Sequence, residues 1–218
     1  MSEKICVIFG AGTEFPDKII LPENERLLIA ADGGFSKLGE LGIKPDRIIG
    51  DLDSLDITPD GDNFTLLPHI KDTTDTFEAV QTGIKEGCTE FHIYGGTGGR
   101  LDHTLANIQL AAQLSQNGCK ALVYGRNYIV TAVTDGSLHL PARDSGYVSV
   151  FAHCDECTGV TIRGLFYEVA DVTLKNDFAL GVSNEFVGRP AEISVKHGTL
   201  IVYYETGEQH EKTSQSRQ

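Results

Sequence analysis

Short apolar runs alternate with helical patterns through the first 125 residues of the chain. Runs typical of buried strands occupy residues 4–10, 26–32, 46–51, 63–70, 90–96 and 120–125. Between several of these runs, apolar residues recur every three or four positions, which indicates amphipathic helices. Strands that alternate with helices predict a parallel sheet with right-handed crossover connections.

Three segments of this first half carry the helical pattern. The segment at residues 33–42 is expected to form a short helix, and longer helices are expected at 76–86 and 101–115. The apolar residues that share one face are Phe77, Val80 and Ile84 in the second segment, and Leu101, Leu105, Ile108, Ala112 and Leu114 in the third. These faces are predicted to pack on the sheet.

The pattern changes after about residue 127, where short β-rich runs are separated by Gly, Asp and Asn without a helical period. These runs lie at 127–136, 137–142, 147–154, 160–164, 171–175, 191–196 and 199–204. This pattern of short β-rich runs predicts a small antiparallel sandwich or barrel. We therefore expect a Rossmann-like parallel α/β domain at 1–130, a β-sandwich domain at 131–206 and a polar, disordered tail at 207–218.

Charge and hydropathy narrow the function classes. The chain has 31 acidic and 18 basic residues, and this balance argues against a nucleic-acid binder. No apolar run approaches the roughly 20 residues of a membrane span. The first residues pass directly into a strand-like run without a basic region or cleavage pattern, so we expect a cytoplasmic protein.

The five cysteines are interpreted in two groups. Cys6, Cys88 and Cys119 lie in or beside strand-like runs, which is typical of buried, reduced thiols. Cys154 and Cys157 form a CxxC pair next to His153. A structural zinc site needs four ligands, and the chain has no second paired motif, so zinc stays a minor alternative.

Acidic residues follow several of the predicted parallel strands. Asp51 and Asp53 come directly after the run at 46–51, and chain alternation places both on the same side. Asp32, Asp75 and Asp102 occupy comparable loops. Because carboxyl ends of parallel strands share one edge of a sheet, these loops are expected to converge. Carboxylates that hold Mg²⁺, with Arg100 beside them, suit phosphate chemistry.

Each of these residues also has a purely structural interpretation. Asp75 could be a helix N-cap with Glu78 completing a capping box, and Asp102 could simply favour a helix dipole. Asp32 before two glycines could form a turn, and His103 could be a local hydrogen-bond partner. The glycine turn at 95–100 is not followed by the Lys-Ser/Thr of a P-loop, but its N–H groups could surround a polyphosphate.

Several motifs together resemble the thiamine pyrophosphokinase family. They are DGG at 32–34, GDLDS at 50–54, KDTTD at 71–75, GGRLDHTLANI at 98–108, GVSNE at 181–185 and ISVKHGTLIVY at 193–203. The resemblance spans residues 4–204 with the motifs in the family's order. It implies transfer of diphosphate from ATP to thiamine, with AMP as the second product. It also implies an α/β catalytic domain, a β-sandwich domain that binds thiamine, and a homodimer with active sites at the subunit interface.

The resemblance assigns roles to individual residues. The magnesium ligands would be Asp51, Asp53 and Asp75; the ATP-binding residues would be Asp32, Thr74, Gly98, Gly99, Arg100 and His103; and the thiamine-binding residues would be Ser183 and Asn184. Asp102 would lie close to the metal. Either Asp102 or Asp75 is expected to accept the hydroxyl proton, and the sequence does not choose between them. Asp56 lies outside the motifs and is expected on the surface.

Two departures from the family pattern concern the thiamine pocket. Phe166 and Glu168 stand where the family usually has a lysine and a proline, and the chain has no tryptophan to contact the thiamine ring. Tyr167, Phe178 and Phe186 are the aromatic alternatives. A diphosphokinase acting on another hydroxymethyl acceptor, such as a pterin, and a non-catalytic thiamine or nucleotide sensor are the rival functions. GVSNE and the complete set of motif acids favour the thiamine enzyme.

Overall fold

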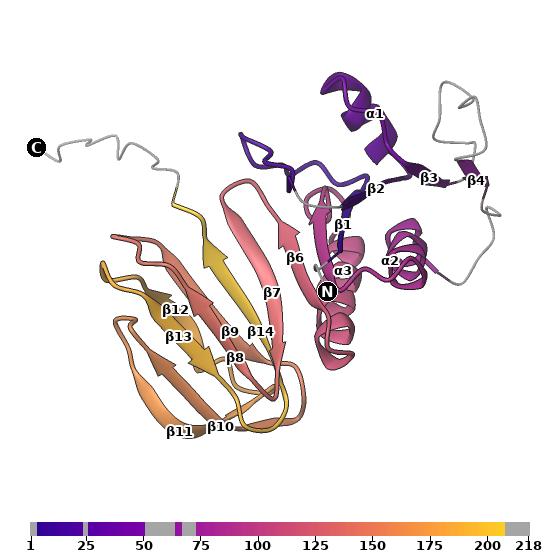
Figure 1. The fold of residues 1–218 in the computed structure, drawn as a ribbon. Coiled ribbons are helices and arrows are strands. Elements are labelled where there is room, and N and C mark those ends of the chain that lie inside the picture. Colours follow the sequence, from indigo (N-terminus) through magenta and orange to yellow (C-terminus); the bar gives the residue numbers. More distant parts are fainter. Residues whose placement is uncertain (1–3, 24–25, 51–63, 67–72, 208–218) are drawn as a thin grey trace, which may run out of the picture.

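The computed structural model describes residues 4–23, 26–50, 64–66 and 73–207 (Figure 1). The predicted site residues Asp51 and Asp53, together with Asp56, lie outside the described residues. The described strands form a ten-stranded mixed sheet and a separate four-stranded antiparallel sheet. In the part of the chain that is described, no helix is long and apolar enough to cross a membrane, and the cytoplasmic location stays a prediction.

One side of the ten-stranded sheet is parallel, as the alternating pattern predicts. Its strands are β1 (Ile5–Phe9), β2 (Arg26–Ala31), β3 (Arg47–Gly50), β4 (Phe64–Leu66), β5 (Glu90–Tyr94) and β6 (Lys120–Tyr124). Their order in the sheet is β6-β5-β1-β2-β3-β4, so the chain builds outward from β1 first in one direction and then in the other. The order therefore reverses between β1 and β5, the kind of point at which open α/β sheets bind ligands.

The other side of the same sheet is antiparallel and comprises β7 (Tyr128–Thr134), β14 (Thr199–Glu205), β9 (Tyr147–Ala152) and β12 (Gly181–Glu185). β7 pairs with β6, with Leu122 opposite Thr131, so hydrogen bonding runs uninterrupted past residue 130. The domain boundary expected there stays a prediction. β12 was not among the predicted strands, because its sequence GVSNE carries only one large apolar residue.

The four-stranded sheet covers the antiparallel side of the large sheet and completes a sandwich. Its strands are β8 (Ser137–Leu140), β10 (Glu156–Arg163), β11 (Val169–Lys175) and β13 (Ala191–Ser194), in the order β11-β10-β13-β8. Val150 and Val202 from the large sheet share one core cluster with Val160 and Ile193 from the small one. The predicted antiparallel β half is thus confirmed, and no helix occurs between residues 128 and 205.

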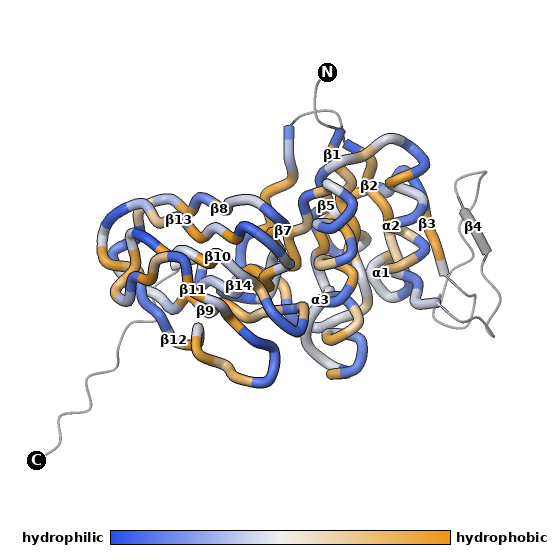
Figure 2. The backbone as a smooth tube through the Cα atoms, turned by 90° about the horizontal axis from the view of Figure 1, so that it is seen from below, coloured by the Kyte–Doolittle hydropathy of each residue, from blue (hydrophilic) through white to orange (hydrophobic). Residues whose placement is uncertain are grey.

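Three helices flank the parallel strands in the described residues: α1 (Gly34–Glu40), α2 (Asp75–Lys85) and α3 (Leu101–Gln116). α2 and α3 share a core cluster with one face of the sheet, whereas Leu38 of α1 packs on the other face (Figures 1 and 2). The three helices predicted from the periodicity are confirmed.

The buried faces of the two longer helices differ in part from the prediction. Val80 is buried as expected, but Ile84 near the end of α2 is 41% exposed. Leu101 and Leu105 are 71% and 54% exposed, because the first turns of α3 begin at the carboxyl edge of the sheet. Later turns of α3, from Leu110 onward, supply the buried side chains instead.

A row of hydrogen-bonded polar side chains lies on the sheet face that carries α1. His92 contacts Glu90 Oε1 through Nε2 at 2.7 Å, and its Nδ1 lies 3.2 Å from the Tyr124 hydroxyl. Lys120 Nζ lies 3.0 Å from the same glutamate oxygen. The hydrogen bond with His92, and then Lys120, lowers the pKa of Glu90 from its ordinary 4.5 to about 2. Glu90 is therefore a charged acceptor that links β5 to β6.

Because the folded-state pKa of Glu90 lies below its ordinary value, its stabilisation is present above about pH 4.5 and is lost toward pH 2. We expect Glu90→Gln to lower the unfolding free energy at pH 7 by about 1–3 kcal/mol. The difference from the unsubstituted protein should narrow as the pH falls to 3. Urea unfolding at a series of pH values measures both quantities.

Glu86→Gln is the matched control, since Glu86 is exposed and its ion pairs with Lys4 and Arg47 are both as long as 3.7 Å. It should change the unfolding free energy by no more than about 0.5 kcal/mol. A Glu90→Gln deficit that stayed constant between pH 7 and pH 3 would contradict the role given to Glu90.

Candidate active site

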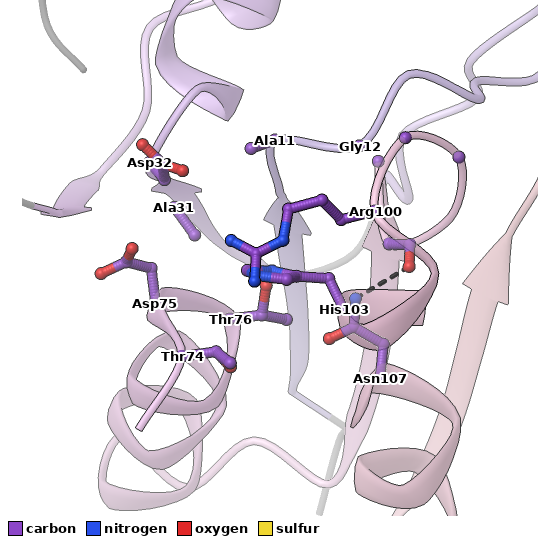
Figure 3. Close-up of a pocket in the computed structure, with 14 residues that line it drawn as sticks. Ala11, Gly12, Ala31, Asp32, Thr74, Asp75, Thr76, Arg100, His103 and Asn107 are labelled. Atoms are coloured by element: carbon purple, nitrogen blue, oxygen red, sulfur yellow. Dashed lines mark hydrogen bonds between the residues drawn. The ribbon is translucent and has the colours of Figure 1, made fainter. Parts of the chain in front are cut away.

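A cavity of about 180 Å³ opens at the point where the strand order reverses (Figure 3). Loops that follow β1, β2 and β5 line it, together with the first turns of α2 and α3. The lining residues are Ala11, Gly12, Ala31, Asp32, Thr74, Asp75, Thr76, Gly95, Gly96, Gly98, Gly99, Arg100, His103 and Asn107. The loops that carry Asp32 and Asp75 thus converge at one sheet edge, as the alternating pattern predicts. Asp102 does not line the cavity, and the loop with Asp51 and Asp53 lies outside the described residues.

The glycine turn after β5 forms one wall of the cavity. Gly95, Gly98 and Gly99 have φ angles of 63°, 80° and 73°, a region that favours glycine. The turn presses against the loop after β1, where Gly12 N–H donates to Gly95 O at 2.8 Å. A Cβ atom on Gly12 would lie 2.3 Å from Thr97 O, so this close approach requires glycine.

Two carboxylates, from Asp32 and Asp75, lie on the side of the cavity opposite the glycine turn (Figure 3). Asp32 directly follows β2 with a φ of 49°, and its N–H donates to Ile49 O at 2.9 Å. Asp75 is the first residue of α2. Carboxylate oxygens suit Mg²⁺, so both residues fit a magnesium-bound phosphate. Within the described ranges no three acidic, histidine or cysteine side chains form a metal cluster, and the metal assignment stays a prediction.

The N-cap of α2 is Thr74, whose hydroxyl accepts a hydrogen bond from Phe77 N–H at 3.2 Å. The alternative interpretation of Asp75 as the N-cap is therefore wrong by one residue. Glu78 does not complete a capping box either, because its carboxylate accepts a hydrogen bond from the Thr73 hydroxyl at 2.6 Å. Thr74 therefore supplies the cap, and Asp75 lines the cavity on the same side as Asp32 (Figure 3).

Arg100 extends over the cavity from the N-cap position of α3 (Figure 3). Its guanidinium group holds Asp102 through two hydrogen bonds, Nη2 to Oδ2 at 2.6 Å and Nε to Oδ1 at 3.2 Å. This pairing raises the pKa of Arg100 and lowers the pKa of Asp102. Asp102 is largely exposed and is not among the lining residues, so it orients Arg100 rather than facing the cavity.

Some lining residues had no role in the sequence interpretation. Asn107 is 5% exposed and donates from Nδ2 to Gly96 O at 2.8 Å, which fixes the glycine turn to α3 (Figure 3). A polar residue within a predicted helical face was the available signal for it. Ala11 and Thr76 also line the cavity, and nothing in their sequence context distinguished them.

The predicted thiamine residues lie on β12, at the far edge of the large sheet. Ser183 is exposed with a φ of 60°. Asn184 is buried, and its side-chain amide forms two hydrogen bonds with the backbone of Tyr167. Its Oδ1 accepts from Tyr167 N–H at 2.9 Å, and its Nδ2 donates to Tyr167 O at 2.7 Å. A role for either residue in binding thiamine stays a prediction.

A second, more apolar cavity of about 370 Å³ lies beside Asn184. Tyr167, Glu168, Leu180 and Val182 are among its lining residues. Of the aromatic alternatives, Phe186 is buried in the sandwich core, and Phe178 lines a different, smaller cavity. Tyr167 is thus the aromatic residue that combines an exposed ring with a place in this cavity.

The departure at Glu168 has a local explanation. Its Oε1 accepts hydrogen bonds from Gly164 N–H at 2.8 Å and from Arg189 Nη2 at 2.8 Å. The glutamate therefore closes the turn at 164–168, where a proline would supply rigidity by a different means. Phe166 is 63% exposed and lies edge-on to Tyr167, with ring centroids 4.8 Å apart.

Among the described residues, His153, Cys154 and Cys157 do not form a cluster of three side chains that could hold a metal ion. Cys157 is fully buried and its thiol donates to Thr199 O at 3.1 Å. Burial raises the pKa of Cys157, which keeps the thiol protonated. Cys6 and Cys88 are buried, as predicted, whereas Cys119 is half-buried.

Comparison with known proteins points to one family. The model "Thiamin pyrophosphokinase, catalytic domain" matches residues 20–123, and "Thiamin pyrophosphokinase, vitamin B1 binding domain" matches residues 137–200. The curated thiamine pyrophosphokinase of Bacillus subtilis is 25% identical over 204 residues, which cover 90% of this chain and 95% of that protein.

Solved structures share the fold. The thiamine pyrophosphokinase from Bacillus subtilis gives a TM-score of 0.82 at 24% identity, covering 94% of this chain and 99% of that one. The enzyme from Geobacillus thermodenitrificans gives 0.80 at 24% identity, with the same coverage of 94% and 99%. The enzyme from Candida albicans gives 0.71 at 14% identity, covering 93% and 89%.

Gly12→Ala tests whether the close approach of the two loops holds the site together. The new methyl group would collide with backbone atoms on both sides of the glycine turn, so we expect the unfolding free energy to fall by about 2 kcal/mol or more. Gly39→Ala is the control, because nothing lies within 4 Å of the added atom in α1. It should raise stability by about 0.5–1 kcal/mol. Equal effects of the two substitutions in urea unfolding would contradict the steric argument.

Proposed function

The chain belongs to the thiamine pyrophosphokinase family, and we infer that it transfers diphosphate from ATP to the hydroxyl group of thiamine. The products are thiamine diphosphate and AMP. The observation that carries the proposal is that both halves of one chain match the two domain models of this family. The match to a vitamin B1 binding domain favours thiamine over a pterin acceptor.

The cavity at the strand-order reversal suits the polyphosphate of ATP. The N-termini of α2 and α3 both lie at this cavity, and helix N-termini favour anions through their unpaired N–H groups and dipole. Arg100 adds a positive charge, and Gly98 and Gly99 line the cavity with backbone atoms alone. Thr74 and His103 line the same space, which supports their assignment to ATP.

Mg²⁺ is the metal that this donor set fits. Asp75 would hold it together with Asp51 and Asp53, and Asp32 lies on the same side of the cavity as Asp75 as a further oxygen donor. The ion, when bound, neutralises charge on the phosphate oxygens. The net charge of −13 makes such compensation necessary for a tetra-anionic nucleotide to approach the acidic rim.

In the reaction, the thiamine hydroxyl oxygen forms a bond to the β-phosphorus of ATP while the bond to the α-phosphate oxygen breaks. AMP departs with that oxygen, and the hydroxyl proton passes to a carboxylate. Asp75 is the better candidate to accept this proton, because the hydrogen-bonded guanidinium of Arg100 makes Asp102 a weaker base. Positioning and charge neutralisation supply most of the catalysis in such transfers.

We place thiamine in the apolar cavity beside Asn184, with Tyr167 against a ring of the ligand and the carboxylate of Glu168 near the thiazolium charge. Within one chain this cavity is remote from the ATP site. Strands β6, β7, β14 and β9 separate β12 from β5, so Ser183 lies five strand spacings, about 24 Å, from β5. A homodimer in which the β half of one chain faces the ATP cavity of the other would bring the two together.

The reaction is tested by incubating the protein with ATP, Mg²⁺ and thiamine and separating the nucleotides. AMP should form in amounts equal to thiamine diphosphate, whereas ADP as the product would contradict diphosphate transfer. We expect Asp51→Asn, Asp53→Asn and Asp75→Asn each to reduce kcat/KM at least about a hundredfold, or roughly 3 kcal/mol. Asp56→Asn is the control and should behave like the unsubstituted protein. Loss of activity in Asp56→Asn equal to that in Asp53→Asn would contradict the metal assignment.

Sharing of each site between two copies is tested by complementation. Arg100→Ala and Tyr167→Ala should each be inactive alone, since they damage the ATP and thiamine parts respectively. After mixing, subunit exchange should restore up to about one quarter of the wild-type activity, because half of the dimers carry one intact site in two. No recovery despite demonstrated subunit exchange would show that each site lies within one chain.

A further inference from the structure

A hydrogen-bonded network behind the glycine turn joins it to the antiparallel half of the molecule. Glu14, in the loop after β1, accepts a hydrogen bond on Oε2 from the Tyr128 hydroxyl at 2.6 Å. The same oxygen accepts a hydrogen bond from the Thr97 hydroxyl at 3.2 Å. Neither Glu14 nor Tyr128 lines the cavity, and neither has a role in the mechanism above.

Glu14 forms hydrogen bonds to the glycine turn through both its backbone and its side chain. Its N–H donates to Thr97 O at 3.2 Å, while its carboxylate receives the Thr97 hydroxyl. Thr97 is 1% exposed, so the turn residue in these hydrogen bonds is buried, while the bonds themselves are partly buried. A Cβ atom on Gly98 would lie 2.8 Å from both N and Cγ of Glu14, which shows how closely the residue follows the turn.

Tyr128 is a rigid donor to this carboxylate. Its ring packs on Gly125, where a Cβ atom would lie 2.2–2.5 Å from three ring carbons. The Tyr203 ring of β14 also lies against it, with centroids 5.1 Å apart and the rings tilted by 35°. Burial, and then the hydrogen bond to Glu14, raise the pKa of Tyr128 to about 12, so the hydroxyl stays protonated at neutral pH. β7 and β14 thereby fix the position of one oxygen atom behind the turn.

The turn needs such a fixed point because its own sequence supplies little rigidity. Gly95, Gly96, Gly98 and Gly99 have no side chains to pack, and glycine loses more backbone freedom on ordering than any other residue. Thr97 is the one residue of 95–99 with a side chain, and that side chain is bound to Glu14. Preorganised N–H donors bind an anion more tightly than mobile ones, since less ordering remains to be done on binding.

We propose that Glu14 and Tyr128 are positioning residues for the nucleotide: through Thr97 they hold the glycine turn in the conformation that receives the ATP polyphosphate. This inference rests on the proposed function, in which that turn contacts ATP. It makes ATP affinity depend on a hydroxyl group from the antiparallel half of the same chain. The thiamine part of the site has no contact with this network and should not respond to it.

The test is Tyr128→Phe, which removes only the hydroxyl group. We expect the KM for ATP to rise about tenfold, with kcat changed by less than about threefold and the KM for thiamine by less than about twofold. Glu14→Ala should have the same effect, and Glu14→Gln should recover most of it because the amide oxygen can still accept both hydrogen bonds. Tyr203→Phe is the control on the neighbouring ring and should leave both KM values unchanged.

Two results would overturn the inference: an unchanged KM for ATP in Tyr128→Phe, or a loss confined to kcat and matched by a loss of folded protein. Titration calorimetry with Mg²⁺ and a non-hydrolysable ATP analogue separates this failure from failure of the proposed function. If the wild-type chain binds the analogue but forms no thiamine diphosphate, the function is wrong, and weaker binding by Tyr128→Phe still supports the positioning role. If the wild-type chain does not bind the analogue, both are wrong.

Discussion

The site depends on the contact of two backbone loops at the point where the strand order reverses. Gly12 and Gly95 approach until an N–H and a carbonyl meet at 2.8 Å, a separation that no side chain at Gly12 would permit. A parallel sheet creates this opportunity, because it delivers the ends of β1 and β5 side by side. The absence of side chains then leaves space and open N–H groups where the sheet edge meets α2 and α3.

Charge in this region is divided between opposite walls. The carboxylates of Asp32 and Asp75 lie on one side, and the glycine turn and Arg100 lie on the other. Asp102 is acidic but lies outside both walls, because its carboxylate binds the guanidinium group of Arg100 rather than facing the cavity. A metal-bound polyphosphate has matching polarity along its length, with the cation toward the carboxylates and free phosphate oxygens toward the donors.

Much of the fold followed from sequence periodicity, since buried strands and helix faces have periods of two and 3.6 residues. Prediction failed where tertiary contacts decide. Leu101 and Leu105 fit the helical face but begin beyond the sheet, and β12 forms through backbone pairing with β9 rather than through apolar side chains. In the site, the loops could be predicted to converge. The hydrogen bond between Glu14 and Tyr128, 114 positions apart, leaves no local pattern in the sequence.

The pairing of β6 with β7 has a consequence for how the chain folds. One sheet passes through both halves of the chain, so each half depends on the other to pair its strand at the junction. Without β7, β6 would present unpaired N–H and C=O groups along Leu122–Tyr124. Exposed edges of this kind recruit strands from other chains. A ribosome-bound chain that has emerged only as far as residue 125 therefore has β6 as an unpaired edge strand, and this lasts until β7 emerges and pairs with it. By pairing with β6, the first strand of the antiparallel half removes this edge from the parallel half.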